Sequence, residues 1–428
     1  MSINRATIRD LRRRNRSTLL RRLFFSGPLG RQELARLTGL SSATVTNVMA
    51  ALIAEGVVVE AGVEESDGGR PRVLLRVNGN HRLVVGVDVG ETRVRVELFD
   101  LAMRKRAGSE IAIHPAHHEP GVIVEAIAKG LGRAMSDCSA ELDSILGIGV
   151  GVPGVVESFG EQVVHAPGFG WSHVPLGGMI GSATGLPVLV DNGAKTMGQA
   201  EMWFGAGRGV RHAAIVLLGT GVGAAIFTDG AIYRGATSSA GELGHTSVVV
   251  GGRHCRCGAN GCLEAYVGAG AILERWAQMS GQPRRPDEDE EATLKALLTG
   301  AEGDGPASRL LDETALYIGV GIANLVNLFN PERIVIGGWV GLLLGPALLP
   351  RIRDVAAAQA LNYPFGRVSI ELGRLGSDAV ALGAATLVAE QFLTHGDAAV
   401  RRRESQPAAV GEPVSNSPTL ETAATRLT

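Results

Sequence analysis

A short stretch of the chain, from Gly241 to Glu264, gathers residue types that ligate a metal ion. Within eighteen positions it holds one imidazole and three thiols, namely His245, Cys255, Cys257 and Cys262. Zn²⁺ favours four nitrogen and sulfur donors of this kind, and a closed site stabilises the fold around it. The spacing therefore predicts a structural zinc site with these four ligands.

Two other interpretations of this stretch stay open. His254 directly precedes Cys255 and is a rival for the nitrogen position. Alternatively, the thiols are buried structural groups beside a core histidine, although three of the four cysteines in one glycine-rich loop favour a metal. Cys138 stands alone and is interpreted as a small buried side chain. Glu242 and Glu264 flank the ligands, where they are free to accept hydrogen bonds from a polyol.

The composition suits an α/β protein with more than one domain. The chain has 428 residues, of which 45% are hydrophobic and only 4% aromatic. This length allows two or three substantial cores. No long apolar run occurs and the beginning of the chain is rich in arginine, so we expect no membrane span, no secretion and a cytoplasmic location. In that compartment cysteines are more often metal ligands than disulfide partners.

Charge is distributed unevenly along the chain. The net charge is −2, but residues 1–80 carry 13 arginines against 7 acidic residues, a balance of +6. This balance favours a polyanionic partner. A basic arm at residues 1–14 precedes three predicted helices: 15–25, 31–38 and a third that begins at Ser41 or Ser42. The third helix repeats apolar residues at helical spacing, namely Val45, Val48, Leu52 and Ile53.

Two β-branched runs, 57–59 and 73–77, then pair as a hairpin, which completes a winged helix-turn-helix pattern. The third helix leaves short polar side chains exposed for base edges in the major groove: Ser42, Thr44, Thr46 and Asn47. At the hairpin tip, Arg70 or Arg72 can enter a narrow A·T-rich minor groove. We expect a DNA-binding dimer or tetramer on an inverted repeat. The alternative is a small helical domain used only for protein contacts.

Three strand-and-turn segments follow, each with glycines that let backbone N–H groups approach an anion. The first contains Asp88, Gly90 and Thr92, the second Gly219, Thr220 and Gly221, and the third Gly337 and Gly338. Their order indicates an actin/hexokinase-type (ribonuclease H-like) ATPase fold with a sugar cleft between two lobes. The expected domains are 1–80, a first lobe at 81–192 completed by about 376–394, a second lobe at 193–375, and a disordered tail at 395–428.

Residues 83–390 resemble the ROK family of repressors and sugar kinases. The resemblance rests on Glu242-Leu243-Gly244-His245 and on the segment from Cys255 to Glu264, which match the family's E-x-G-H and C-x-C-G-x-x-G-C-x-E patterns. It implies that Glu242, His245 and Glu264 contact sugar hydroxyls and that the His/Cys₃ set holds zinc. Pro153-Gly154 resembles the family's segment at the cleft wall. The repressor branch carries a winged helix in front, as here.

The chain departs from the kinase pattern at the catalytic base. Family kinases have an Asn-Asp pair at 192–193, where this chain has Asn192 and Gly193. Asn192 is still expected to contact the sugar. Glycine cannot accept the proton of the attacking sugar hydroxyl, and Asp191 is a weak substitute because it lies about 6 to 7 Å from Gly193 along a strand. Lys195 replaces a second asparagine. Glu91 places a carboxylate in the first phosphate turn, where the family commonly has glycine.

The sequence therefore predicts a transcriptional repressor whose ROK-type domain binds a sugar or sugar phosphate without phosphorylating it. Structural zinc is expected and ATP is not. The runner-up is an active sugar kinase with an added DNA-binding domain, and a third interpretation is a regulator whose effector is a partner protein.

Overall fold

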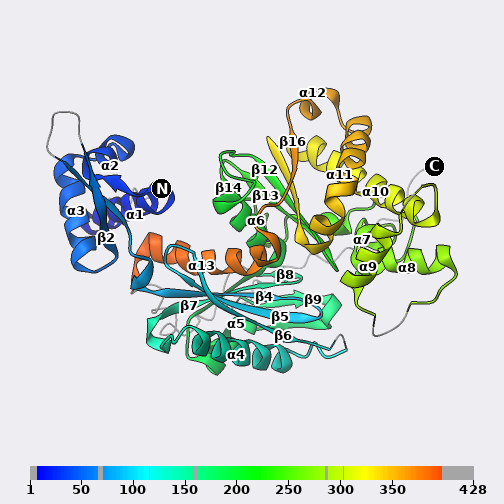
Figure 1. Cartoon of the computed structure of the whole chain (residues 1–428), viewed down its shortest axis with the longest axis horizontal. Helices are drawn as coiled ribbons and strands as arrows, with labels where there is room; N and C mark the ends of the chain where they lie inside the picture. The colour runs from blue at the N-terminus through cyan, green and yellow to red at the C-terminus, as the bar shows by residue number, and fades with distance from the viewer. Residues whose placement is uncertain are drawn as a thin grey trace, which may run out of the picture.

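The computed structural model describes residues 7–65, 71–114, 116–157, 162–284, 288–301 and 303–397. The predicted tail beyond 397 and the wing residue Arg70 lie outside these residues. The N-terminal part consists of α1 (Ile8–Ser26), β1 (Leu29–Gly30), α2 (Arg31–Thr38), α3 (Ser42–Ala54), β2 (Val58–Glu64) and β3 (Arg72–Val77). The three strands form one sheet in the order β1-β3-β2. Figure 1 shows this part at one end of the molecule, beside α13.

The turn between α2 and α3 forms for local reasons. Gly39 ends α2 in the left-handed conformation, with φ of 69°, which glycine adopts without steric cost. Ser41 caps α3, since its side chain accepts a hydrogen bond from the Thr44 backbone N–H. The fully buried residues of α3 are Val45, Met49 and Leu52, and the predicted Val48 and Ile53 are partly buried against the same core.

The expectation of a basic arm over residues 1–14 is wrong for its second half. Helix α1 begins at Ile8 because Thr7 and Asp10 form a capping box, in which each side chain binds the other residue's backbone N–H. Several arginines assigned to the arm therefore lie on the first turns of this helix.

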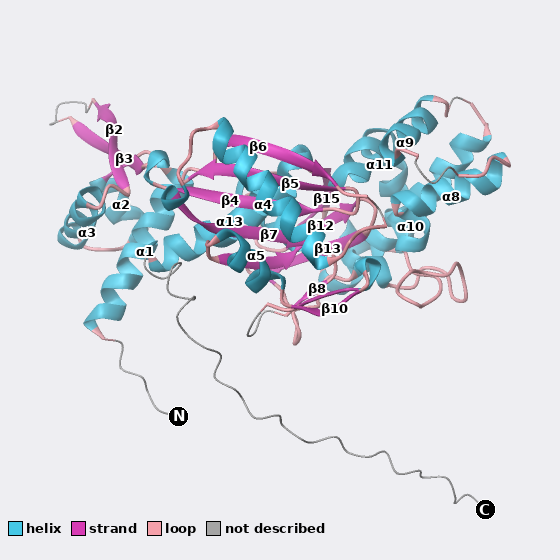
Figure 2. Ribbon diagram, turned by 90° about the horizontal axis from the view of Figure 1, so that it is seen from below, coloured by secondary structure: helices cyan, strands magenta, loops and turns pink. Residues whose placement is uncertain are grey.

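The first lobe is built on a five-stranded sheet in the order β11-β7-β4-β5-β6. Its strands are β4 (Leu83–Val89), β5 (Arg93–Asp100), β6 (Lys105–Ala112), β7 (Ile145–Val152) and β11 (Val188–Asn192). Helices α4 (Pro120–Asp137) and α5 (Leu176–Thr184) cover one face, as Figure 2 shows. A small sheet, β8 (Val155–Val156), β9 (Val164–Ala166) and β10 (Trp171–Val174), adjoins it.

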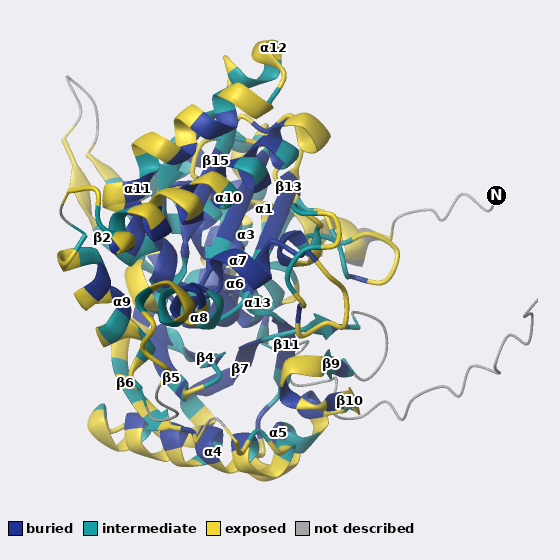
Figure 3. Ribbon diagram, turned by 90° about the vertical axis from the view of Figure 1, so that its right-hand side faces the viewer, coloured by how far each residue is buried: buried dark blue, intermediate teal, exposed yellow. Residues whose placement is uncertain are grey.

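The second lobe repeats this topology in the order β14-β13-β12-β15-β16, with three antiparallel strands followed by two parallel ones. Its strands are β12 (Ala213–Leu218), β13 (Val222–Thr228), β14 (Ala231–Ile232), β15 (Arg333–Gly337) and β16 (Ser369–Leu372). Its further helices are α7 (Glu264–Val267), α8 (Ala269–Ser280), α9 (Glu290–Thr299), α10 (Pro306–Phe329), α11 (Gly338–Gln359) and α12 (Asn362–Phe365). Figure 3 shows the central strands buried beneath partly exposed helices.

Two helices form the layer between the sheets. Helix α6 (Gly193–Phe204) packs on β12 and β13, α13 (Ala379–His395) packs on β4 and β7, and the two helices pack on each other. Close approach requires glycine here: a Cβ at Gly86 or Gly149 would collide with the α13 backbone, and one at Gly383 with the Thr196 carbonyl. The layer therefore couples α6 tightly to both sheets.

Within the described residues no single helix is long and apolar enough to cross a membrane. The bent pair α2 and α3 meets that criterion by length and composition alone.

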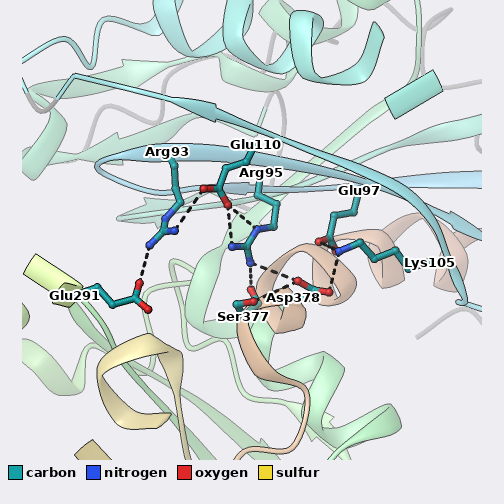
Figure 4. A network of polar contacts seen from close by, with 8 residues as sticks. All are labelled: Arg93, Arg95, Glu97, Lys105, Glu110, Glu291, Ser377 and Asp378. Carbon is teal, nitrogen blue, oxygen red and sulfur yellow. Dashed lines mark hydrogen bonds and ion pairs between the residues drawn. The ribbon is translucent and has the colours of Figure 1, made fainter. Parts of the chain in front are cut away.

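A network of ion pairs joins the first sheet to the turn before α13 (Figure 4). Arg95 binds Glu110, and Lys105 bridges Glu97 and Asp378 at 2.6 and 2.9 Å. Glu97 is fully buried, and among the described residues its Oε2 has no hydrogen-bond partner. Burial raises the pKa of Glu97 to about 7. A carboxyl with a raised pKa in the folded state keeps a proton that the unfolded chain loses.

We predict that the free energy of unfolding decreases as the pH rises from 5 to 8. The contribution of Glu97 is fully present below its ordinary pKa and is lost as the pH passes about 7; it amounts to about 1 to 3 kcal/mol. Burial raises the pKa of Asp88 to about 6, which adds a slope of the same sign. In urea unfolding at several pH values, Glu97→Gln should flatten the slope, whereas Glu110→Gln should not. An unchanged slope in Glu97→Gln would contradict this assignment.

Candidate effector cleft and metal centre

The four predicted metal ligands converge in the loop between β14 and α7. One donor atom from each of His245, Cys255, Cys257 and Cys262 lies within 4.8 Å of the others. Nδ1 of His245 is 3.7 Å from the Cys255 sulfur, and the sulfurs of Cys257 and Cys262 are 3.7 Å apart. A tetrahedral site with Zn–S bonds of about 2.3 Å places its sulfurs about 3.8 Å apart. The donor set therefore fits zinc, and the rival His254 is not part of it.

The loop is shaped to bring these donors together. Gly258 and Gly261 adopt positive φ values of 93° and 80°, and a Cβ at Gly261 would collide with the Val249 carbonyl. Burial and the neighbouring thiols raise the pKa of Cys262 to about 12. A thiol with a raised pKa keeps its proton until a metal ion displaces it.

A second group of metal-ligating side chains lies on the small sheet: Glu157, His165 and His173. Nε2 of His165 is 2.8 Å from the Glu157 carboxylate, and the two histidine rings are 4.3 Å apart. This cluster is half exposed, so any zinc analysis has to separate it from the His/Cys₃ set.

Asn192 caps α6 at the floor of the cleft. Its side-chain oxygen accepts hydrogen bonds from the backbone N–H groups of Ala194 and Lys195, and its amide donates to the Gly154 carbonyl at 2.7 Å. These contacts fix the start of α6 against the predicted cleft wall and occupy much of the amide. Its sugar contact stays a prediction: within the described residues the second N–H of the Asn192 amide donates no hydrogen bond and can bind a ligand.

Gly193 is the first residue of α6, and its glycine is not required by the backbone. A Cβ there would meet nothing closer than 3.8 Å, and its φ is not in the left-handed region. A Cβ at this position would therefore make only ordinary contacts. The weak substitute base Asp191 is buried and points to another partner, because both of its oxygens accept hydrogen bonds from Arg234, at 2.6 and 3.2 Å.

Lys195 adds a buried cation next to this pair. Its side chain is 3% exposed and donates a hydrogen bond to the Ser238 carbonyl, while Arg234 contacts the Ser238 hydroxyl at 3.2 Å. Burial lowers the pKa of Lys195, and Arg234 acts in the same direction. Burial raises the pKa of Glu242, against the attraction of His245 and Lys195. Glycine thus stands at the position of the kinase Asp, and the cation Lys195 stands at the position of the second Asn.

Glu264 is buried at the start of α7, and its two oxygens have different partners. One accepts the backbone N–H of Val222 at 2.9 Å, and the other accepts Nε of Arg256 at 2.8 Å. The same guanidinium binds Glu91, in the first turn, at 2.5 Å. Arg256 also lies over the second turn, because a Cβ at Gly221 would be 2.8 Å from its Nη2.

The three predicted glycine turns meet at this position. Gly219 accepts the backbone N–H of Ala269 at the start of α8, and Trp339 of the third turn lies against Gly219. Asp88 lies in β4, just before the first turn, and is near Arg93 and Arg95. The predicted turns therefore lie close together, with charged side chains of the protein among them.

Arg234 and Arg256 were not identified from the sequence as site residues. Arg256 carried a local signal, since it lies between two metal-ligand cysteines. Arg234 carried none, because its partner Asp191 is 43 positions away.

Two lobes of repeated topology with glycine turns define an actin/hexokinase-like protein, here preceded by the part that holds α1 to α3 and the β1-β3-β2 sheet. The ROK family model matches residues 84–391, and the chain belongs to this family. It is 33% identical to a putative xylose repressor of Caldicellulosiruptor sp. (strain Rt8B.4), over 92% of this chain and 99% of that protein. It is 36% identical to a glucokinase of Halalkalibacterium halodurans, over 72% of this chain and 96% of that protein.

A solved structure of a ROK family transcriptional regulator, described as a homologue of the E. coli MLC protein, also resembles the chain. Its TM-score is 0.75 at 27% identity, and the match covers 90% of this chain and 97% of that one. The glucokinase match covers 72% of the chain, whereas the matches to the regulator and the xylose repressor cover 90% and 92%.

We predict one zinc ion in the His/Cys₃ set. Cys257→Ser should remove about one equivalent of zinc by elemental analysis and lower the melting temperature, since the loop also positions Glu264. Cys138→Ser is the matched control, because Cys138 contacts only helix carbonyls of its own segment within the described residues. His173→Ala separates zinc bound at the second cluster. Full zinc content in Cys257→Ser would rule out this site.

Proposed function

We propose that the protein is a DNA-binding transcriptional repressor whose ROK-type cleft binds a sugar or sugar phosphate without phosphorylating it. Its similarity to the putative xylose repressor, which extends over nearly the full length of both chains, supports this proposal. The observation that carries it is helix α6, which begins at the cleft and ends against the helix-turn-helix part.

The far end of α6 contacts α1 through aromatic side chains. Trp203 is 8% exposed, and its ring lies 5.8 Å from Phe24 and 4.9 Å from Phe25, both edge to face. An ion pair at 2.6 Å between Arg21 and Glu390 joins α1 to α13 as well. A helix of 12 residues spans about 18 Å, so α6 links the cleft to α1 as one rigid element.

The proposed DNA surface is the N-terminal part of α3 together with the wing. Ser42, Thr46 and Asn47 are exposed, while Thr44 is half-buried and bonded to Ser41. Arg72 is exposed at the start of β3. We infer an inverted-repeat operator rich in A·T pairs, bound by a homodimer or homotetramer, because dimeric helix-turn-helix proteins match the symmetry of such sites.

The proposed boundaries follow from packing. Residues 1–80 carry the DNA-binding part, 81–192 the first lobe and 193–375 the second. Helix α13 packs on β4 and β7, which supports the assignment of 376–394 to the first lobe.

We infer that the cleft keeps the groups for sugar binding. Glu242, His245 and Glu264 surround it, and His245 directs Nδ1 to the thiols, which leaves Nε2 for a hydroxyl. Zinc would fix the orientation of this ring and of the loop that carries Glu264. Its expected role is structural, since four protein ligands leave no open position for a substrate.

We infer that phosphoryl transfer fails for lack of a base. A correctly placed base contributes typically 10²- to 10⁴-fold in rate, and the attacking hydroxyl needs an acceptor near position 193. Gly193 offers none, and Asp191 is bound to Arg234. The identity with a glucokinase makes an active kinase the second candidate.

We predict no sugar-dependent turnover of ATP to ADP and sugar phosphate by the parent protein with D-glucose, D-xylose or N-acetylglucosamine. Gly193→Asp should place a carboxylate at this position without a clash at its Cβ and restore slight activity. The readout is ADP release with and without sugar. Robust turnover by the parent would overturn the proposal and favour the kinase, with Asp191 as its base.

The effector sugar is first identified by thermal shift, and the DNA ligand is selected from a random pool. We predict that this sugar lowers the affinity of the protein for the selected DNA by about tenfold or more, the usual range of such coupling. Trp203→Leu should keep DNA affinity and sugar binding but reduce this effect several-fold, because it removes the aromatic contact between α6 and α1. Trp276→Leu, in α8 of the second lobe, is the matched control. Fluorescence anisotropy measures the DNA affinity, and equal sugar effects in the parent and Trp203→Leu would exclude this route.

A further inference from the structure

Arg256 lies where the first turn, the second turn and the segment around Gly168 meet. Its guanidinium binds Glu91 at 2.5 Å and Glu264 at 2.8 Å. The glycines on both sides leave room for it: a Cβ at Gly221 would be 2.8 Å from Nη2, and one at Gly168 would be 3.4 Å from Nη1. Arg256 therefore fills the space over the second turn and joins the two lobes through Glu91.

Glu91 is held in place by its surroundings. Its backbone carbonyl contacts Nε2 of His118 at 2.7 Å, and the His118 ring stacks on Phe169 with centroids 4.2 Å apart and planes 3° apart. Trp171 donates a hydrogen bond to the His118 carbonyl at 2.6 Å. The Glu91 side chain is only 21% exposed. Its carboxylate is thus a fixed anion in the first turn.

The charges around Arg256 disfavour a further anion. One guanidinium faces two carboxylates, Glu91 and Glu264, so the group carries net negative charge. Glycine turns in such folds attract phosphates because their backbone N–H groups point at the anion. A carboxylate fixed among these turns competes for the same positive groups, and it repels a polyphosphate in a partly desolvated cleft.

We propose that Glu91 is a specificity-determining residue that excludes nucleotides: paired with Arg256, it takes the place of a nucleotide's phosphate groups between the first two turns. The cleft then accepts a carbohydrate alone. This inference deepens the proposed function, on which it rests for the role of the sugar. It goes beyond the missing base at Gly193, because it concerns nucleotide binding and not the chemical step.

The test is nucleotide binding by isothermal titration calorimetry, with AMPPNP and Mg²⁺ as the probe. The parent should show no binding at millimolar nucleotide, whereas Glu91→Gly should bind it at least about tenfold more tightly, since it removes the competing charge and frees Arg256. Glu91→Gln, which keeps the side-chain volume, should show a smaller gain in the same direction. Glu91→Gln also provides the test if Glu91→Gly fails to fold.

Glu291→Gln is the matched control. Glu291 of α9 pairs with Arg93, the first residue of β5, at 3.3 Å between the same two lobes. The Glu291→Gln variant should bind AMPPNP no more tightly than the parent protein. Tight binding by the parent, an equal gain in Glu291→Gln, or no gain in both Glu91 variants would overturn the inference. Sugar-dependent DNA release, measured separately on the parent, tests the proposed function, so failure of one proposal is distinguishable from failure of the other.

Discussion

Helix α6 is fixed at both of its ends, and the account of the protein depends on this constraint. At the cleft end Asn192 caps the helix and binds the Gly154 carbonyl. In the middle, the backbone of Thr196 lies directly against Gly383 of α13. At the far end Trp203 packs between Phe24 and Phe25 of α1. Well-packed interfaces tend to switch between discrete arrangements instead of deforming gradually, and we propose that a change in lobe closure reaches the N-terminal part through this helix.

The same fold serves catalysis or binding according to the charges that line its cleft. A kinase places an acceptor for the hydroxyl proton and open turns for phosphates. In this chain Gly193 removes the acceptor, and Lys195 and Arg234 bring cations to the floor. Glu91 brings an anion to the turns. If no chemistry follows, the binding energy of a sugar remains available to bias one lobe closure over another, and its effect on DNA is limited to its differential affinity for the two.

Features with a short-range signal could be predicted from the sequence, and long-range pairings could not. Helix α2 at residues 31–38 and the Ser41 cap of α3 follow from local propensity and were predicted correctly. The start of α1 was missed because the capping box of Thr7 precedes a run of arginines that resembles a disordered arm. The contact of Arg256 with Glu91 joins residues 165 positions apart, and no periodicity or spacing encodes it.

The most direct test of this coupling is reciprocal binding. The affinity of the sugar, measured by isothermal titration calorimetry, is compared between the free protein and the protein saturated with its selected DNA. Linkage requires the two ligands to change each other's affinity by the same factor. The account predicts that DNA weakens sugar binding by the factor by which sugar weakens DNA binding, about tenfold or more. Equal sugar affinity in the free and DNA-bound protein would contradict it.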